Sequence, residues 1–242
     1  MVTGVAGGIG RAVAARFRSQ GFEVLGIDKV PRPADLVIDR YVVLDLEQLV
    51  TLPEVSQPLV DELDAWCGPT GLSVLVNNAA VQVCGTFDEL DIAGWETSLR
   101  VNLLAPFLLV QNLLARLEQA RGCVVNVSSI HARLTKPGFV TYATTKAALS
   151  GMTRAMAVDL GPRIRVNAVE PASVETDMLM ASFAGREEDF LDLARYYPQE
   201  RLASPDEVAA LISSVATGEF RFLHGACIDL SGGVSGRLHD AV

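Results

Sequence analysis

Tyr142 and Lys146 are the residues of this sequence whose types and spacing most directly predict chemistry. They are four positions apart, about one turn of a helix, so their side chains are expected on the same helical face. An ammonium beside a phenol favours the phenolate, and lowering a tyrosine pKa from about 10 to about 7 requires about 4 kcal/mol. A unit charge about 4 Å away, at an effective dielectric constant of about 20, supplies about that much. Tyr142 would then exchange a proton with a substrate hydroxyl near neutral pH.

Ser129 lies thirteen residues before Tyr142, at the carboxyl end of a predicted strand over residues 123–128. Its hydroxyl is expected to hydrogen-bond the oxygen that exchanges a proton with Tyr142. Taken singly, each of these residues has a structural explanation, such as a solvated helix face or a strand-end cap. The combination favours a catalytic site, with Tyr142 as base in oxidation and as acid in reduction.

A glycine-rich turn at residues 3–10 (TGVAGGIG) leads directly into a helical pattern over residues 11–19. Glycines such as Gly4 let the backbone bend tightly and approach a pyrophosphate closely. The free N–H groups from Gly8 to Gly10 and the positive end of the helix dipole would meet its charge. The turn therefore predicts a dinucleotide site.

Asp28 ends the next predicted strand, eighteen residues after Gly10. A carboxylate at the tip of this strand can accept hydrogen bonds from the ribose hydroxyls of adenosine. It would also repel the 2′-phosphate of NADP, so we predict NAD as the preferred cofactor. We expect Lys29 to be the only cation near the turn.

Short apolar runs alternate with amphipathic helical patterns along the whole chain. Strands are predicted over residues 23–28, 41–44, 72–77, 123–128, 163–169 and 226–229, and helices over 9–19, 59–67, 95–118, 142–160 and 205–216. Such alternation predicts an α/β Rossmann fold, a doubly wound parallel sheet with helices on both faces. Only Met1 and Val2 precede Thr3, so the first strand is expected to be short. No linker divides residues 1–242, which we interpret as a single NAD-binding and catalytic domain.

These residues, in this order, resemble the short-chain dehydrogenase/reductase family over nearly the full length. The turn is similar to the family's Thr-Gly-x-x-x-Gly-x-Gly pattern, and Tyr142 and Lys146 match its Tyr-x-x-x-Lys spacing. Residues 77–80 (NNAA) resemble Asn-Asn-Ala-Gly, and Asn102 matches the helix asparagine. The resemblance implies that Asn102 holds a water linking Lys146 to solvent, and that Lys146 also binds the nicotinamide ribose.

The resemblance also implies which residues contact the cofactor. Asp45 and Leu46 are expected to hold the adenine ring, and Val174 and Thr176 the nicotinamide carboxamide. The implied cofactor-binding residues are Gly4, Gly8, Ile9, Gly10, Asp28, Asp45, Leu46, Asn78, Ala79, Ala80, Tyr142, Lys146, Pro171, Val174 and Thr176. Ala80 and Ala172 stand where the family usually has glycine, which changes local backbone geometry more than activity.

Substrate recognition is expected at Gln82 and His131, which resemble polar positions in dehydrogenases of 3-hydroxybutyrate and of sugars. They suggest a small secondary alcohol or ketone, such as a polyol, a sugar or a short hydroxy acid. Residues 178–201 are expected to form a substrate lid. Two alternatives stay open: a non-catalytic NAD-binding sensor or regulator, and a 3-oxoacyl-type reductase.

Composition limits the possible partners. The formal net charge is −9, which disfavours nucleic acid, and no run of about 18 apolar residues predicts a membrane span. Four dispersed cysteines and the histidines His131, His224 and His239 predict neither a disulfide framework nor a metal site. The chain opens without a signal-peptide pattern, so a cytoplasmic location is expected. Two apolar helices, at residues 102–117 and 142–160, suggest a homotetramer (a dimer of dimers), the common state in the family.

Overall fold

Seven parallel strands form one sheet in the computed structural model, which describes residues 1–218 and 220–237. The strands are β1 (Val2–Thr3), β2 (Leu25–Asp28), β3 (Arg40–Val43), β4 (Val74–Asn77), β5 (Cys123–Val127), β6 (Arg165–Pro171) and β7 (Cys227–Leu230). Their order is β3-β2-β1-β4-β5-β6-β7, so the direction of winding reverses between β1 and β4. This is the predicted doubly wound sheet, and a crevice forms at the carboxyl ends of the strands where the winding reverses.

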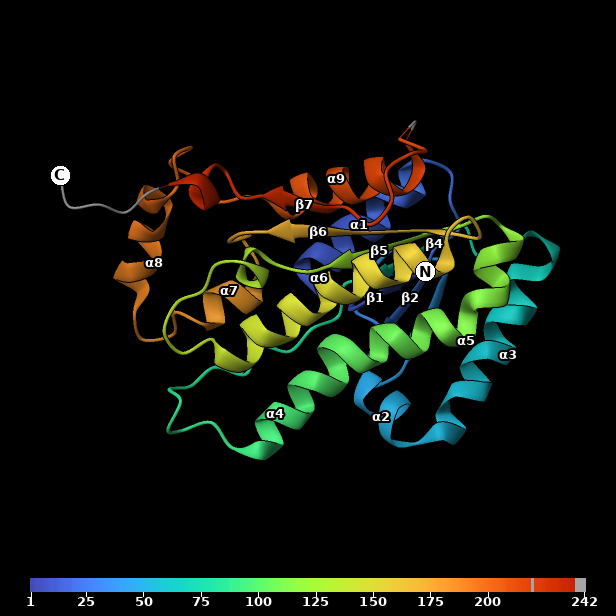
Figure 1. The fold of residues 1–242 in the computed structure, drawn as a ribbon, viewed down its shortest axis with the longest axis horizontal. Coiled ribbons are helices and arrows are strands. Elements are labelled where there is room, and N and C mark those ends of the chain that lie inside the picture. Colours follow the sequence, from blue (N-terminus) through green and yellow to red (C-terminus); the bar gives the residue numbers. More distant parts are fainter. Residues whose placement is uncertain (219, 238–242) are drawn as a thin grey trace.

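Helices cover both faces of the sheet (Figure 1). They are α1 (Gly8–Ser19), α2 (Leu46–Thr51), α3 (Ser56–Cys67), α4 (Ile92–Leu99), α5 (Ala105–Gln119), α6 (Val140–Leu160), α7 (Asp177–Ala181), α8 (Glu187–Leu193) and α9 (Pro205–Thr217). Helices α1 and α9 pack together on one face, and α5 and α6 pack on the other. The sheet is therefore buried on both faces, as its continuous apolar strands predict.

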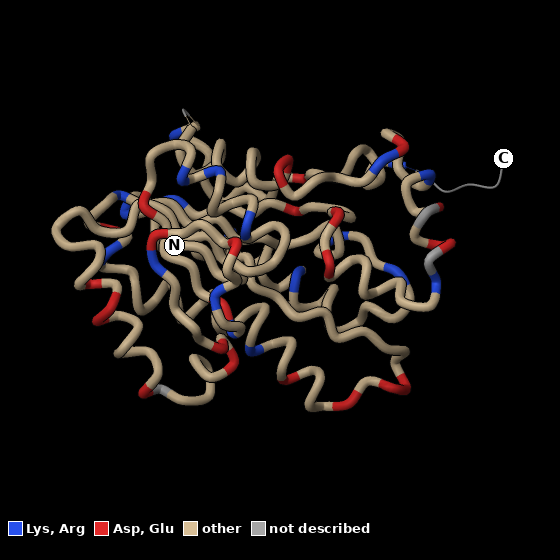
Figure 2. Tube along the Cα trace, turned by 180° about the vertical axis from the view of Figure 1, so that it is seen from behind, with Lys and Arg blue, Asp and Glu red and all other residues tan. Residues whose placement is uncertain are grey.

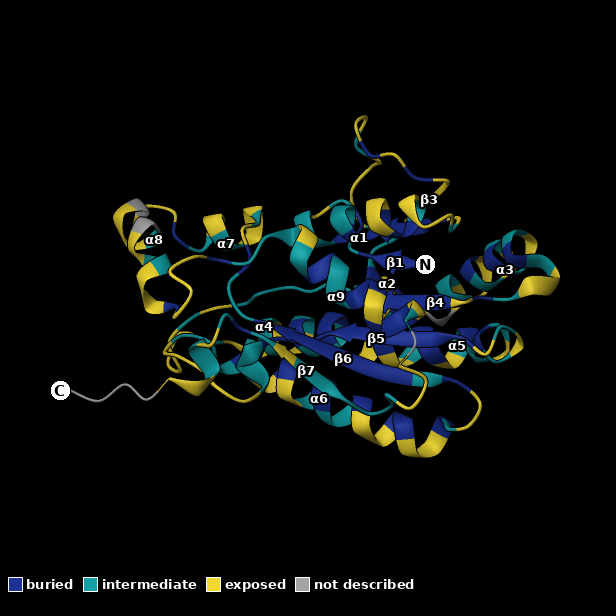
Figure 3. Cartoon of the chain, turned by 90° about the horizontal axis from the view of Figure 1, so that it is seen from above, coloured by how far each residue is buried: buried dark blue, intermediate teal, exposed yellow. Residues whose placement is uncertain are grey.

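The core consists of two apolar clusters, one on each face of the sheet. Val124 and Val125 are adjacent in β5 and both fully buried, because successive strand residues point to opposite faces. Figure 3 shows the buried strands between layers of half-buried helices. Two-sided burial fixes the carboxyl ends of β1, β2, β4, β5 and β6, where the predicted site residues lie.

Most predicted elements are present with shifted ends, and the predicted start of α9 is confirmed. Ser204 accepts a hydrogen bond from the Glu207 N–H, and the Glu207 carboxylate accepts one from the Ser204 N–H, which forms a capping box. The helix predicted at residues 95–118 is interrupted by a π-helical turn, Arg100–Leu104. Such turns are frequent at functional sites.

The helical stretch Ile92–Gln119 is long and apolar enough to cross a membrane, by length and composition alone. Its most apolar 18-residue stretch has a mean hydropathy of 1.3, and 44% of that stretch is buried inside the fold. Leu109, Leu113 and Leu117 are fully buried against the sheet, so its apolar character is explained by packing in the core.

Charged residues are interspersed along the chain (Figure 2), and many are paired at the surface. Arg100, for example, contacts both Glu47 and Glu96. The negative net charge is thus spread over the surface, and exposed pairs of this kind contribute little stability.

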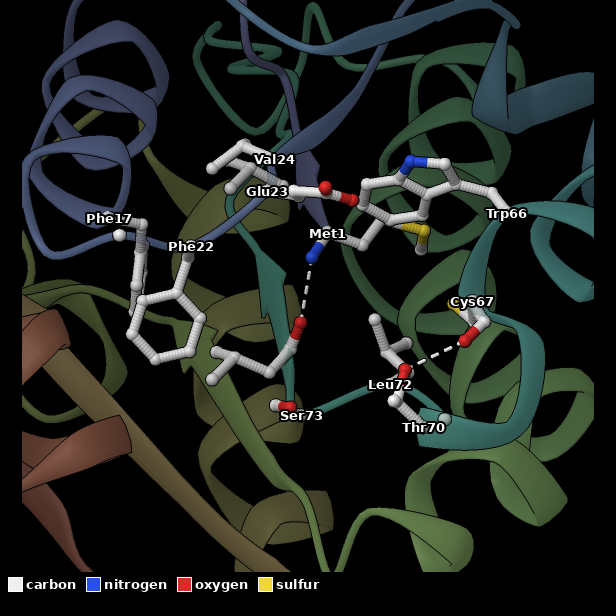
Figure 4. Close-up of a pocket in the computed structure, with 14 residues that line it drawn as sticks. Met1, Phe17, Phe22, Glu23, Val24, Trp66, Cys67, Thr70, Leu72 and Ser73 are labelled. Carbon is white, nitrogen blue, oxygen red and sulfur yellow. Dashed lines mark hydrogen bonds between the residues drawn. The ribbon is translucent and has the colours of Figure 1, made fainter.

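A small pocket of about 240 Å³ lies at the amino ends of β1 and β4 (Figure 4). The Met1 nitrogen donates a hydrogen bond to the Val74 carbonyl at 2.7 Å, and the Phe22 and Trp66 side chains line the walls. Because parallel strands all run the same way, this pocket is at the opposite end of the sheet from the crevice.

Candidate active site

A cleft of about 1060 Å³ lies at the carboxyl ends of the strands. The predicted site residues that line it are Gly4, Gly8, Ile9, Gly10, Asp28, Asp45, Leu46, Asn78, Ala79, Ala80, Gln82, Ser129, His131, Tyr142, Lys146, Pro171, Val174 and Thr176. Asn102 lies behind this wall and is buried. The structure thus brings together residues that are up to about 170 positions apart in the sequence, and places Asn102 outside the lining.

The glycine turn has the geometry of a phosphate cradle. Gly4 has a φ of +64°, and a Cβ at Gly10 would lie 2.1 Å from the Gly4 carbonyl oxygen, so neither position accepts a side chain. Helix α1 begins at Gly8, and its first turn carries no acidic residue. A helix N-terminus without a nearby carboxylate can bind the negative charge of a pyrophosphate, and the cleft has room for a dinucleotide.

Thr176 closes over this turn from the segment after β6. A Cβ at Gly8 would lie 3.0 Å from the Thr176 Cγ2 atom. The Thr176 hydroxyl also caps α7 by accepting a hydrogen bond from the Leu179 N–H. Segments far apart in the sequence therefore meet at the start of α1.

Asp28 is held against the turn. One of its carboxylate oxygens accepts a hydrogen bond from the Ala6 N–H at 2.9 Å, and the other accepts one from the Val30 N–H at 3.4 Å. The expectation that Lys29 is the only cation near the turn is wrong. Arg11 donates to the Ala6 carbonyl at 2.8 Å and pairs with Asp35. One turn of helix separates Arg11 from Gly7, so the start of α1 carries this side chain back beside the turn.

The residues expected around the adenosine also have structural contacts. The Asp45 carboxylate caps α2 by accepting from the Glu47 N–H, and Leu46 is buried in the core. Asn78 donates from its side chain to the carbonyls of Thr3 and Gly4, while the Thr3 hydroxyl accepts from the Asn78 and Ala79 N–H groups. Thr3 thereby joins β1 to β4, a role that sequence reasoning did not assign.

Tyr142 and Lys146 lie on one face of α6, as their spacing predicts, with the Lys146 Nζ atom 5.6 Å from the Tyr142 ring centroid. The predicted lowering of the Tyr142 pKa is wrong. Burial raises it to about 12, and a hydrogen bond with Ser129 only partly opposes the rise. The Lys146 ammonium is directed to the Val127 carbonyl, 2.7 Å away, and burial lowers its pKa to about 8. Helical spacing fixes the common face, but this hydrogen bond determines where the ammonium points.

Ser129 is the second residue after the end of β5. It caps the short 3-10 helix Ile130–Ala132. Its hydroxyl accepts a hydrogen bond from the His131 N–H at 3.2 Å. It also lies 3.4 Å from the Pro171 carbonyl, at the end of β6. These contacts hold the hydroxyl beside Tyr142 at the centre of the cleft.

Asn102 lies in the π-helical turn, and both polar atoms of its amide are engaged. The amide oxygen accepts from the Val81 N–H at 2.8 Å, and the amide nitrogen donates to the Val81 carbonyl and to the Thr145 hydroxyl. Asn102 therefore connects the segment after β4 to the residue preceding Lys146.

A buried polar chain behind Lys146 was missed by sequence reasoning. The Ser128 hydroxyl donates to the Lys146 carbonyl at 3.0 Å and lies 2.8 Å from the Ser150 hydroxyl, which donates to Glu170. Glu170 is 1% exposed, and its other oxygen accepts from Arg133 at 2.8 Å. The only signal in the sequence is a carboxylate at the end of the apolar strand β6, because its partners come from distant segments.

His131 forms one wall of the cleft near Tyr142. Its ring stacks on Phe139, with centroids 4.6 Å apart, and meets the Tyr142 ring edge-on at 5.8 Å. Burial lowers the pKa of His131 to about 4, so the imidazole is neutral at physiological pH. Gln82 also lines the cleft, and its side-chain nitrogen lies 3.5 Å from the Cys84 sulfur.

The expected lid region contains α7 and α8 and returns to the cleft at Tyr197. The Tyr197 hydroxyl donates to the Ser173 hydroxyl at 2.6 Å and accepts from the Ser173 N–H at 3.0 Å. Phe183 and Phe190 pack edge to face. The end of this segment is thus tied to the loop after β6.

Within residues 1–218 and 220–237, no three His, Cys, Asp or Glu side chains are grouped to hold a metal ion. His224 accepts a hydrogen bond from the Val166 N–H through its Nδ1 atom. His239 lies outside the described residues.

Comparisons with known proteins agree with this architecture. The family described as enoyl-(acyl carrier protein) reductase matches residues 4–235. The chain is 31% identical over 246 residues to the 3-oxoacyl-(acyl-carrier-protein) reductase FabG of Aquifex aeolicus (strain VF5), covering 97% of this chain and 96% of that one. It is 29% identical to the D-threitol dehydrogenase of Mycolicibacterium smegmatis, covering 96% and 91%.

The fold is also similar to that of the ligand-free aldohexose dehydrogenase of Thermoplasma acidophilum. The TM-score is 0.92 at 27% identity, covering 100% of this chain and 95% of that one. The strand order of the sheet, the family match and the similar solved structure together define the class of the protein as Rossmann-type oxidoreductases. Within that class, the chain belongs to the short-chain dehydrogenase/reductase family.

Proposed function

We propose that this protein is an NAD-dependent dehydrogenase that transfers hydride between the nicotinamide and a small secondary alcohol or ketone. The observation that carries the proposal is the convergence of Ser129, Tyr142 and Lys146 on one cleft that also holds the glycine turn. When bound, the cofactor supplies the hydride acceptor or donor. The protein supplies binding, orientation and proton transfer.

Tyr142 is proposed as the proton-transfer residue. With a pKa of about 12, its phenol is protonated at neutral pH and can donate to a ketone oxygen that gains negative charge during reduction. Ser129 donates a hydrogen bond to the same oxygen. In the oxidation direction, Tyr142 would accept the proton as the phenolate, which the nearby Lys146 ammonium would favour.

Asn102 is proposed to act through its backbone. Its side chain is occupied by Val81 and Thr145, so a water held for the proton path would bind the Asn102 carbonyl instead. In a regular α-helix this carbonyl would accept from the residue four positions later, which is Pro106 and has no N–H. Asn102 lies in a π-helical turn, where the α-helical pattern is already broken, and Pro106 removes the donor four positions on, which supports the Asn102 carbonyl as an acceptor for water.

Asp28 supports a preference for NAD over NADP. Its carboxylate lines the cleft within reach of an adenosine ribose and is fixed by the Ala6 N–H. Lys29 and Arg11 lie nearby, but Arg11 is paired with Asp35, so its charge is partly neutralised before any phosphate arrives. We expect the repulsion between the Asp28 carboxylate and the 2′-phosphate of NADP to outweigh the attraction of Lys29 and Arg11.

The preferred substrates are short polar alcohols, hydroxy acids, polyols or sugars. The neutral His131 and Gln82 offer hydrogen bonds at the cleft wall. The similarity to a 3-oxoacyl-(acyl-carrier-protein) reductase keeps 3-oxoacyl substrates as a second candidate. The similarity to a D-threitol dehydrogenase favours polyols.

Three further expectations belong to the proposal. Residues 178–201 close over substrate as a lid, with Tyr197 and Ser173 as the anchored end. The protein assembles as a homotetramer through the outer faces of α5 and α6, where Phe107 and Val158 are exposed. It is cytoplasmic, consistent with four free cysteines.

A substrate screen tests this function. Secondary alcohols, polyols and hydroxy acids are mixed with NAD, and 3-oxoacyl thioesters with NADH, while the absorbance of NADH is followed. Turnover of any small alcohol supports the dehydrogenase, and turnover of thioesters alone replaces it with the 3-oxoacyl reductase. Tight NADH binding with no turnover in either panel favours the sensor.

A further inference from the structure

The chain has only three lysines, Lys29, Lys136 and Lys146, and all three line the cleft. Lys146 donates to the Val127 carbonyl beside Tyr142, and Lys29 is adjacent to Asp28 at the adenosine end. Lys136 is different, because it lies in the loop between β5 and α6, on the substrate side. The groups around Lys136 therefore help to determine which substrates the enzyme binds.

Lys136 is next to the catalytic end of the cleft. Its Nζ atom lies 4.5 Å from the centroid of the Phe139 ring, which stacks on His131 and meets Tyr142 edge-on. It also lies 5.9 Å from the Phe183 ring, which follows α7 in the proposed lid. The ammonium thus lies between the aromatic wall of the cleft and the lid segment.

The charge of Lys136 is not neutralised by any described acidic side chain: no salt bridge joins it to an Asp or Glu within the described residues. Burial lowers its pKa, the nearby Cys84 thiol partly opposes this, and the Arg186 guanidinium lowers it further, although the side chain remains accessible. Aromatic faces compensate a partly desolvated ammonium only in part. By contrast, Arg133 in the same loop is bound to Glu170 and Asp229.

We infer that Lys136 forms a carboxylate subsite, and that the substrates are therefore short hydroxy acids and oxo acids rather than neutral alcohols. This inference rests on the proposed function and narrows its substrate class. The reacting carbon would lie at Tyr142, with the carboxylate directed past Phe139 to the ammonium. A phosphate usually binds several donors or a helix N-terminus. A carboxylate is favoured here because Lys136 offers one ammonium, while the neighbouring Arg186 donates to the Ser182 carbonyl and pairs with Asp189.

Binding to the enzyme–NADH complex tests the subsite without requiring turnover. Calorimetry would compare 3-hydroxybutyrate with 1,3-butanediol, in which a hydroxymethyl group replaces the carboxylate. Wild type is expected to bind the acid about 10- to 100-fold more tightly, the range of a charge-assisted hydrogen bond. Lys136→Met should bring this ratio to about 1, and Lys136→Arg should keep most of it.

Arg186→Met is the matched control, because it removes a nearby positive charge and leaves Lys136 in place. It should change the ratio by less than about threefold if the effect is a direct contact and not the general field. Equal or weaker binding of the acid in wild type, or an unchanged ratio in Lys136→Met, would overturn the subsite. The proposed function fails separately, by an absence of NADH-linked turnover across the whole screen.

Discussion

Lys146 lies one helical turn after Tyr142, yet its ammonium points to the Val127 carbonyl at 2.7 Å and is 5.6 Å from the phenol ring centroid. Lys146 is buried and Tyr142 is half-buried where the cleft meets the end of β5. Burial disfavours both the phenolate and the ammonium, so it raises the pKa of the tyrosine to about 12 and lowers that of the lysine to about 8. The pair is therefore set to hold a proton on Tyr142 at neutral pH.

This arrangement predicts opposite pH dependences for the two reaction directions. Because the phenol is protonated well above neutral pH, ketone reduction should be nearly constant around neutrality. Alcohol oxidation needs the phenolate and should rise by about tenfold per pH unit until Tyr142 ionises in the complex. Ultraviolet titration of wild type minus Tyr142→Phe gives the phenol pKa directly. A midpoint near neutrality would contradict the assigned burial effect.

Lys146→Met should remove activity and increase stability. Burial lowers the lysine pKa from 10.5 to about 8, so holding its charge in the fold costs about 3 kcal/mol near neutral pH. Loss of the hydrogen bond from Lys146 to the Val127 carbonyl offsets about 1 kcal/mol of this. The free energy of unfolding should therefore rise by about 2 kcal/mol in the variant.

The sign of the Lys146→Met effect can be checked with pH. The folded-state pKa is below the unfolded value, so the cost is full below about 8 and disappears as pH rises through 10.5. Urea unfolding at several pH values should show the variant's advantage shrinking over that range. A variant that is less stable than wild type at neutral pH would be the opposite outcome.

Asp28→Ala should weaken NAD and relax the cofactor preference. The carboxylate is expected to provide charge-assisted hydrogen bonds to the ribose, so kcat/KM for NAD should fall by about 10- to 100-fold. The value for NADP should fall less, since a repulsion is removed. Asp35→Ala is the comparison variant: it removes an exposed carboxylate beside the same turn but releases Arg11, so it should leave the value for NAD nearly unchanged and raise the value for NADP. Wild-type turnover with NADP equal to or above that with NAD would refute the preference.

Glu170→Gln should destabilise the polar chain behind the site. The buried carboxylate accepts from both Ser150 and Arg133, whereas an amide has no charge to pair with Arg133 and can keep both contacts only if the Ser150 hydroxyl accepts instead of donating. We expect the free energy of unfolding to fall by about 1–3 kcal/mol and kcat to fall with little change in KM. Glu118→Gln breaks an exposed pair with Arg163 and should cost less than about 1 kcal/mol. Equal effects of the two substitutions would argue against a special role for the chain.

The backbone geometry of the glycine turn and the placement of Asp28 beside it could be predicted because their signals are local. The turn at residues 3–10 and Asp28 at a strand end each fix a backbone geometry that depends on few distant contacts. The Tyr142 pKa could not be predicted, because spacing gives the shared helix face but neither the burial nor the direction of the Lys146 ammonium.

Other features depend on tertiary contacts between distant segments. Glu170 meets Ser150 and Arg133 only when β6, α6 and the loop after β5 pack together. The short helices α2, α7 and α8 were not predicted, since each is only five to seven residues long and begins in a loop. Length and pattern give little signal for such elements.

Turnover by Tyr142→Phe tests whether Tyr142 transfers the proton. The substitution removes one hydroxyl and keeps the ring that packs against His131 and Phe139. Activity on the best substrate from the screen should fall by at least about 10²- to 10⁴-fold, the usual contribution of general acid–base catalysis. NADH should still bind with nearly wild-type affinity by fluorescence titration. Turnover within about tenfold of wild type would contradict the assignment of Tyr142 as the proton-transfer residue.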